Sequence, residues 1–517
     1  MTVYDPSSPM PEAMNPTEAD EGWNQAWSEG DAALRAWVMS HPTHLWSEDI
    51  GLLLAMAATY RWEGAAGAWR ALPYLEKAEI LIDAGPETSG RVRASAALLR
   101  CLVERSRGDL FAALDYADAA LDILSSSHSD IRDRLDLRPA ALLNRGTIRV
   151  LMGDLFRARG DLERGLRDAE PTLNPHKRIE ALGFLAIVEV FTGSVTQADR
   201  VMQTARPLAD RMPGGLWTAP LEISEMLIAA ERDELAHHAP ALRRLMCEVD
   251  GSEFEFLAQH LQVLLAEECD DLEGRFEAIR RMRVIEREST AAGLLRVLRM
   301  GDRAQALMHA GDLARAAVVL RDESDPAHLV CGAALTARAA LAIGEPRRAV
   351  EEIRNCFLDE DHPVRSLAYA AAIDAQARAL LGDLRSADAS FRFLLRECAR
   401  SGALRAFRKM PGRVLTLLID RAMHSDLDPA ERALLDVLVS SVDTAGDVAD
   451  EGIALSPRER MVLGRLAAGE SPRTIAQSLH VSLNTVKTQL RNVYRKLGAS
   501  TRDGALERAR SLGVLTA

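Results

Sequence analysis

The chain has 517 residues and a mass of 56.6 kDa, with 48% hydrophobic and 27% charged residues. This composition is ordinary for a folded globular protein and excludes wholesale disorder; the length allows about three to five compact domains, or fewer if the chain is a solenoid. Aromatic residues contribute only 5%, and an apolar fraction made mostly of Ala, Leu and Val favours packed helices over sheets.

Charge is distributed unevenly along the chain. The formal net charge is −13, but the last 63 residues (455–517) hold 11 basic and 4 acidic residues, which gives this segment +7 and leaves −20 on the remainder. A basic module on an acidic body is typical of a nucleic-acid-binding end, although an ordinary solvated pair of basic helices has the same count. The acidic body is expected to repel DNA and to leave the contact to the tail.

No targeting or membrane signal is apparent. No apolar run approaches the roughly 20 residues that cross a bilayer, and the N-terminus lacks the basic start and apolar core of a signal peptide, so we expect a cytoplasmic protein that does not bind membranes. Residues 1–20, rich in Pro, Ser, Asp and Glu, are predicted to be disordered. The six cysteines occur singly and are expected to be buried thiols without disulfides or metal.

An internal repeat covers the body of the chain. A Gly is followed five residues later by an Ala in six places, and the residue after the Gly is acidic in five of them. The pairs are Gly108/Ala113, Gly153/Ala158, Gly193/Ala198, Gly311/Ala316, Gly344/Ala349 and Gly382/Ala387. The spacing predicts a helix that ends at a left-handed Gly, an acidic cap on the next helix, and a small Ala where the two helices approach closely.

The unit resembles the turn of the tetratricopeptide repeat, although the spacing varies and a generic bundle of helical hairpins fits the pattern as well. The 118 residues between Gly193 and Gly311 are close to three units of 39. We therefore expect an all-α protein: a TPR-like α-solenoid over residues 21–439, a flexible linker over residues 440–454, and a four-helix C-terminal domain over residues 455–517.

The C-terminal segment predicts short helices separated by Gly and Ser-Pro. The first begins at the capping box Ser456-Pro457-Arg458-Glu459, points Met461, Val462, Leu466 and Ala467 inward and stops at Gly469. A short second helix follows Ser471-Pro472, a third runs from Ser482 to about Leu497, and a fourth spans about Arg502–Ser511. In the third helix Val486, Leu490, Val493 and Leu497 form an apolar stripe opposite a basic and polar face. Two short helices joined by a tight turn are typical of a helix-turn-helix, although a solvated amphipathic helix has the same two faces.

The residues of this segment closely resemble the LuxR-type DNA-binding domain. The matching motifs are Leu455-Ser-Pro-Arg-Glu-Arg-Met-Val-Leu, Gly469, Ile475-Ala476, Leu479, Val481-Ser482, Asn484-Thr485-Val486-Lys487-Thr488, Asn492-Val493-Tyr494-Arg495-Lys496-Leu497 and Ser500-Thr501-Arg502. The resemblance implies a recognition helix in the major groove of promoter DNA, with base contacts from Lys487, Thr488 and Arg491. It implies phosphate contacts from Ser482, Asn484, Thr485, Arg495 and Lys496, and a homodimer on DNA through Ala505, Leu506, Ala509 and Leu512. Gln489 and Gly504 depart from the residues usual in the family, His and Glu, and Gly504 weakens a helix by about 1 kcal/mol.

Catalytic signatures are missing from the sequence. There is no GxxxxGK[ST], GxSxG, HExxH or GxGxxG motif in a suitable context, and we expect neither an enzyme nor a cofactor. The best metal candidates, His41 with His44 and His237 with His238, lack companion ligands and are interpreted as ordinary histidines. The leading hypothesis is a transcription regulator whose helical body receives a small-molecule or protein signal. The alternative is an adaptor whose main activity is to bind a protein partner in the groove of the solenoid.

Overall fold

The computed structural model describes most of the chain. The described residues are 35, 39, 42–61, 63–85, 88–126, 131–168, 175–212, 214–288, 293–322, 329–358, 362–446, 457–467, 469–479, 483–497, 499 and 501–511. Every regular element within these residues is a helix, which confirms the predicted all-α class. In the same part of the chain no helix is both long and apolar enough to cross a membrane.

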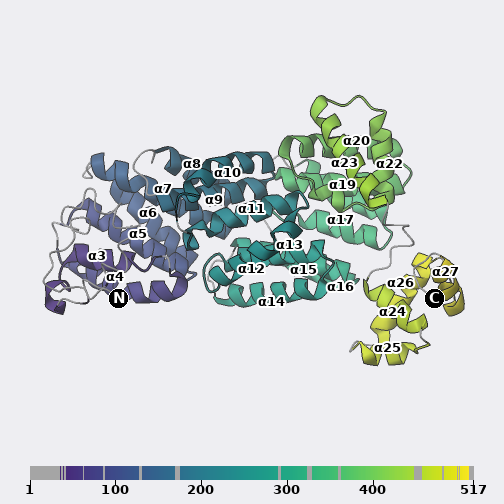
Figure 1. Ribbon diagram of the computed structural model, residues 1–517, viewed down its shortest axis with the longest axis horizontal. Helices are drawn as coiled ribbons and strands as arrows, with labels where there is room; N and C mark the ends of the chain where they lie inside the picture. The colour runs from purple at the N-terminus through teal and green to yellow at the C-terminus, as the bar shows by residue number, and fades with distance from the viewer. Residues whose placement is uncertain are drawn as a thin grey trace.

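Helical hairpins follow one another through the body, from α3 to α23 (Figure 1). The helices of its first half are η2 Thr43–Leu45, α3 Ile50–Ala58, α4 Gly64–Ala84, α5 Gly90–Ser106, α6 Leu110–Ser125, α7 Ile131–Met152, α8 Leu155–Asp168, α9 Pro175–Thr192, α10 Val195–Ala209, η3 Leu216–Thr218, α11 Ala219–Glu231, η4 Leu235–His238 and α12 Ala239–Glu248. Those of its second half are α13 Glu255–Glu268, α14 Leu272–Glu288, α15 Gly293–His309, α16 Leu313–Asp322, α17 Gly332–Ala342, α18 Pro346–Ile353, η5 Arg354–Phe357, α19 Val364–Leu380, α20 Leu384–Ser401, α21 Arg405–Arg408, α22 Gly412–Met423 and α23 Pro429–Gly446.

The six predicted turn glycines all adopt the left-handed conformation. Their φ angles lie between 77° and 99°, and in each turn the N–H of the following residue donates to a carbonyl five residues back, at 2.8–3.0 Å. This is the Schellman arrangement, which a residue with a Cβ adopts only at a cost. The alanine five residues after each glycine has no exposed surface, as expected where two helices approach closely.

Two further turns use Asp instead of Gly. Asp233 and Asp270 have φ angles of 66° and 56°, and the N–H of the residue after each donates to a carbonyl five residues back at 2.8 Å. They divide the long interval between Gly193 and Gly311 into 40, 37 and 41 residues. The expectation of three units in this interval is therefore confirmed, and the Gly signal was missing because Asp tolerates the left-handed region better than most residues.

Acidic capping of the second helices is confirmed in four of the six hairpins. The carboxylates of Asp109, Asp154, Asp312 and Asp383 each accept a hydrogen bond from the N–H three residues later, at 3.2 or 3.3 Å. Ser194 and Glu345 make no side-chain cap. The short Asp side chain reaches the free amides of the first turn, whereas the longer Glu is a poorer N-cap.

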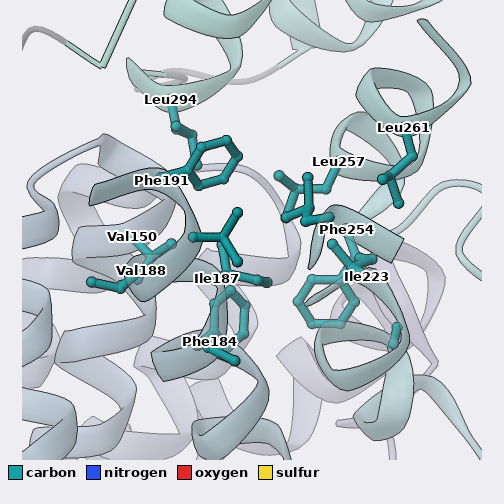
Figure 2. Close-up of a cluster of buried hydrophobic side chains, with 14 of the residues drawn as sticks. Val150, Phe184, Ile187, Val188, Phe191, Ile223, Phe254, Leu257, Leu261 and Leu294 are labelled. Atoms are coloured by element: carbon teal, nitrogen blue, oxygen red, sulfur yellow. The ribbon is translucent and has the colours of Figure 1, made fainter. Parts of the chain in front are cut away.

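The largest hydrophobic core, part of which Figure 2 shows, runs from Cys101 of α5 to α15 and also includes Leu329 and Ala403. Phe184 of α9 packs against Phe254, which immediately precedes α13, with ring centroids 5.8 Å apart. Ile187, Phe191 and Leu257 lie around this pair in Figure 2 and are buried. Because residues from hairpins separated by one or more others share this core, the middle of the body is a continuous packed unit.

The body also folds back on itself. In a simple solenoid each repeat contacts only its neighbours, but here α15 packs against α7, and α19 and α20 pack against α9 and α10. The turn at Gly193 approaches α19 so closely that a Cβ there would lie 2.4 Å from the backbone N of Arg365. Arg365 in turn forms a 2.8 Å ion pair with Glu231 of α11. These contacts join the later hairpins to the middle of the body.

The boundaries of the predicted linker differ from those of the helices. α23 extends to Gly446, so the first seven residues of the segment 440–454 continue a helix. No Gly or Pro precedes Gly446 in this segment to interrupt the helix earlier. Residues 447–454 and the N-terminal segment 1–20 lie outside the described residues, and the predictions made for them stay predictions.

Candidate DNA-binding site

Four short helices form the C-terminal module, at the yellow end of the chain in Figure 1. They are α24 Pro457–Ala467, α25 Pro472–Ser478, α26 Leu483–Leu497 and α27 Arg502–Ser511. Gly469 (φ 90°) ends α24 as predicted, and the Ser471 hydroxyl caps α25 by accepting from the Thr474 N–H at 3.2 Å. The local signals in the sequence thus set the order and the limits of the helices.

Two small hydrophobic clusters hold the four helices together. One joins α24, α25 and α26 and the other joins α24, α26 and α27. Val462 and Leu466 point inward as predicted, but Met461 is 51% exposed and that part of the prediction is wrong. Leu463, 0% exposed, is buried instead. The buried face of α24 is therefore centred on Val462, Leu463 and Leu466, and Met461 lies outside it.

The third helix of the module, α26, has the two faces that its sequence predicts. Val486, Leu490 and Val493 are buried, whereas Lys487 and Arg491 are exposed and lie one helical turn apart. Within the described part of the chain neither Lys487 nor Arg491 forms an ion pair. Both cations are therefore presented to the surroundings from the face opposite the apolar stripe.

The other predicted DNA-contact residues are located only in part. Ser482 lies outside the described residues, and for Asn484, Thr485, Thr488, Arg495 and Lys496 the structure gives the α26 backbone but not the side chains. Their contacts with DNA stay predictions. What the structure brings together on one exposed face is Lys487 and Arg491.

The residues predicted for dimerisation have a role inside the domain. Ala505, Leu506 and Ala509 of α27 are buried in the second cluster, against Leu463 and Val493, and Leu512 lies outside the described residues. The apolar pattern of α27 is thus accounted for by intradomain packing. Dimerisation through α27 stays a prediction, and these three side chains do not form a free surface for a second copy.

The two departures from the family pattern occupy different environments. Gln489 is buried, and its Nε2 lies 3.6 Å from the position that a Cβ of Gly311 would occupy, at the turn between α15 and α16. One edge of α26 therefore contacts the body while the cationic face stays exposed. Gly504 is the third residue of α27, and its N–H donates to the Thr501 hydroxyl at 3.2 Å, so it lies in the first turn and not in the helix interior.

A cavity lined in part by arginine side chains is the main candidate site in the body. It lies where α13, α15, α17, α19 and α21 meet, and Arg338, Arg365, Arg405 and Tyr369 line it. His260 Nδ1 is 2.7 Å from Asp302 Oδ2 on the cavity wall. The His260 Nε2 and Arg405 Nη1 atoms are buried and have no hydrogen-bond partner within the described structure. Unsatisfied buried polar atoms are costly, so a polar ligand that met them would be stabilised.

The guanidinium groups of this cavity are incompletely neutralised. Arg365 pairs with Glu231, and Arg405 pairs with Glu267. Arg338 forms no ion pair with any described residue; burial lowers its pKa to about 10, and nearby Arg405 acts in the same direction. A charge held in this way attracts an anion.

A grouping that the sequence did not predict lies beside the cavity. Cys331, Cys356 and His362 are buried, and their donor atoms all lie within 4.8 Å of one another. The residues are 25 and 6 positions apart in loops and helix ends, so no ligand spacing in the sequence marks them. Of the histidines considered from sequence, His44, His237 and His238 belong to no such grouping among the described residues, and His41 lies outside them.

Comparison with known proteins addresses the C-terminal module. Residues 454–509 match the family model described as "Bacterial regulatory proteins, luxR family". Two similar proteins, each called "Probable transcriptional regulatory protein NarL", come from the CDC 1551 / Oshkosh and ATCC 25618 / H37Rv strains of Mycobacterium tuberculosis. Each is 49% identical over 55 residues, which are 11% of this chain and 26% of the relative. The chain thus spans about a quarter of the length of the curated relatives it matches. Residues 454–509 are a helix-turn-helix domain of the luxR family.

Proposed function

We propose that the protein is a transcription regulator that binds promoter DNA through α26. The observation that carries this proposal is the exposed pair Lys487 and Arg491 on the face of α26 opposite its buried stripe, within a luxR-family domain. Lys and Arg donate to the O6 and N7 acceptors of guanine in the major groove. The two relatives named as transcriptional regulators share this part of the chain.

Charge separation supports the same proposal. The C-terminal segment carries +7 and the remainder −20, so phosphates are attracted to one end and repelled by the other. Ser482, Asn484, Thr485, Arg495 and Lys496 are proposed to bind phosphates and to fix the register of α26, while Lys487, Thr488 and Arg491 contact bases. A homodimer on DNA is part of the proposal, with α27 or another surface as its interface.

The experiment that tests this function is a genome-wide chromatin pull-down with the full chain and with a chain that ends at residue 454. Enrichment of a defined set of promoters by the full chain alone is the expected result. Enrichment that is equal for the two chains, or no enrichment by either, contradicts the proposal.

The body is proposed to receive a small anionic ligand through the cavity lined by Arg338, Arg365 and Arg405. The unneutralised Arg338 and the unsatisfied Arg405 Nη1 and His260 Nε2 favour a carboxylate or phosphate compound. Helices from five parts of the body line this cavity, so a ligand there would shift how the later hairpins pack.

Ligand binding is tested by thermal unfolding of the full chain with a panel of di- and tricarboxylates and phosphate esters. A compound of the correct class raises the unfolding midpoint with the concentration dependence of specific binding. Arg338→Ala should abolish the shift, and Arg347→Ala, at an exposed position on α18, should retain it. A shift of equal size in both variants contradicts the cavity assignment.

The adaptor function is a second candidate because of two exposed aromatic side chains. Phe111 and Phe156 stand three residues after the turn glycines of consecutive hairpins, and they are 58% and 89% exposed. Apolar groups at such positions are available to a protein partner. A stoichiometric partner that co-purifies with the chain, together with no promoter enrichment, would favour this function over the first.

A further inference from the structure

Three helix ends bring two thiols and an imidazole together in the second half of the body. Cys331 is the N-cap of α17, Cys356 lies in η5 directly after α18, and His362 precedes Pro363, the N-cap of α19. All three side chains are at most 6% exposed. Their donor atoms lie within 4.8 Å of one another, and this is the one such grouping in the part of the chain that the structure describes.

The distances fit a metal centre better than a disulfide. The Cys331 and Cys356 sulfur atoms are 3.5 Å apart, whereas a disulfide bond is about 2.0 Å long. Two thiolates bound to one tetrahedral zinc ion at about 2.3 Å each lie about 3.8 Å apart. A disulfide involves only the two sulfur atoms, whereas here a nitrogen of His362 lies beside both of them, as a third metal ligand would.

The electrostatic surroundings favour a thiolate at Cys331. Its Sγ accepts a hydrogen bond from the Ala334 N–H at 3.3 Å, at the N-terminus of α17.

We propose that Cys331, Cys356 and His362 bind one zinc-class divalent cation. Two thiolates and an imidazole are the donor set that zinc prefers, and three protein ligands leave the fourth position of a tetrahedral ion for water or a small ligand. The ion would hold the start of α17, the end of α18 and the start of α19 together. Because Cys331 also lines the arginine cavity, the metal would stabilise one wall of that cavity.

The test uses the reduced full-length protein, freed of metal and titrated with Co²⁺ and then Zn²⁺. The expected result is a thiolate-to-cobalt charge-transfer band in the near ultraviolet and tetrahedral d–d bands in the visible, saturating at one equivalent and abolished when Zn²⁺ displaces Co²⁺. Zinc should also raise the thermal unfolding midpoint, because the folded state alone holds the three ligands together.

Substitutions at single cysteines distinguish metal binding at the proposed centre from metal binding at other thiols. Cys331→Ser and Cys356→Ser should lose the cobalt bands, whereas Cys398→Ser, at a single buried thiol, and Cys269→Ser, at an exposed one, should keep them. His362→Cys should keep tetrahedral binding with a stronger charge-transfer band, which shows binding even if a Ser variant unfolds. Circular dichroism of each variant checks that the helices are retained.

Two outcomes would overturn the proposal. One is the absence of cobalt bands in folded, reduced protein, or bands that survive both Ser substitutions. The other is a Cys331–Cys356 disulfide found by mass spectrometry together with no metal binding after reduction. Neither outcome bears on promoter binding, so this inference and the proposed function fail independently.

Discussion

At the scale of single residues, the left-handed conformation of the turn glycines defines the repeat. Gly344 has a φ of 80°, and nothing lies within 4 Å of the position that its Cβ would take. Gly160, in the interior of α8, is exposed, has no positive φ and also has no neighbour within 4 Å of its Cβ position. The two sites differ in backbone conformation alone, so they form a matched pair.

We predict opposite results for alanine at these two sites. Gly344→Ala should destabilise the body by about 1–2 kcal/mol because its backbone must stay left-handed. Gly160→Ala should stabilise it by up to about 1 kcal/mol through helix propensity. Denaturant unfolding followed by circular dichroism measures both, and a stabilised Gly344→Ala variant would show that the left-handed turn is not required.

The limits of sequence reasoning are also visible at the residue scale. Each predicted turn glycine is left-handed, and the signal that marks it, a Gly with an Ala five residues later, is local and sufficient. Asp233 and Asp270 were not recognised, since Asp occurs throughout helices and turns. The grouping of Cys331, Cys356 and His362 could not be found either, because it depends on how helix ends pack and not on spacing.

At the scale of elements, α27 begins with an incomplete capping box. The Thr501 hydroxyl accepts from the Gly504 N–H, as an N-cap should, but Gly504 stands at the third helical position, where Glu would reach back to the N-cap amide. We predict that Gly504→Glu stabilises the C-terminal domain by up to about 1 kcal/mol, through the completed capping box and a smaller gain in helix propensity at this first-turn position. The Thr501 hydroxyl must shift slightly, because a Cβ at residue 504 would lie 3.0 Å from it.

The measurement is hydrogen exchange of the α24–α27 amides in the full chain. Slower exchange in the Gly504→Glu variant is expected, and Gly504→Ala, which restores propensity without the cap, should give a smaller change. Exchange that is unaffected or faster in Gly504→Glu would contradict this account of the start of α27.

A buried charge cluster joins three elements of the body. Glu180 of α9 has no exposed surface; it forms an ion pair with Arg105 of α5 at 3.0 Å and accepts a hydrogen bond from Lys177 at 2.8 Å. Lys177 also donates to Asn144 of α7 at 2.6 Å. Removing one member of a buried ion cluster leaves a charge without compensation, which costs about 3–5 kcal/mol.

The cluster predicts a specific dependence on pH. Burial opposes ionisation of Glu180, but Lys177 and Arg105 outweigh it, so the Glu180 pKa is lower in the folded protein than in the unfolded chain. Its stabilisation is therefore fully present above the unfolded pKa of about 4.3 and is lost progressively as the pH falls from there through the lower folded pKa. Glu180→Gln should lower the unfolding midpoint at pH 7, and the difference between the midpoints of the variant and the unmodified protein should be smaller at about pH 3. An equal difference at both pH values would contradict the coupling.

Apolar patterns of elements predict burial but not the partner. Val486, Leu490 and Val493 were expected to face inward and do. The apolar side of α27 was assigned to a second copy by family resemblance, but Ala505, Leu506 and Ala509 are covered by the same domain. An apolar stripe has the same pattern in either case, so tertiary structure decides which surface covers it.

At the scale of the whole molecule, a cationic C-terminal domain follows an acidic body. Order of the helices, repeat turns and the luxR-family domain could all be predicted because each depends on short segments. The contacts of α15 with α7, and of α19 and α20 with α9 and α10, could not, since they join hairpins far apart in sequence. The arginine cavity likewise needs helices that are far apart in sequence, from α13 to α21, to meet, and the sequence could not reveal it for the same reason.

The most direct test of the account is a gel-shift titration of the full chain on a promoter fragment recovered by the pull-down, at fixed salt. Lys487→Ala and Arg491→Ala should each weaken specific binding by about 1–3 kcal/mol. The double variant should bind the promoter fragment no more tightly than it binds unrelated DNA. Arg347→Ala, which removes an equal charge from the exposed surface of α18, should bind as the unmodified protein does. Unchanged sequence-specific binding by the double variant would contradict the claim that α26 recognises DNA.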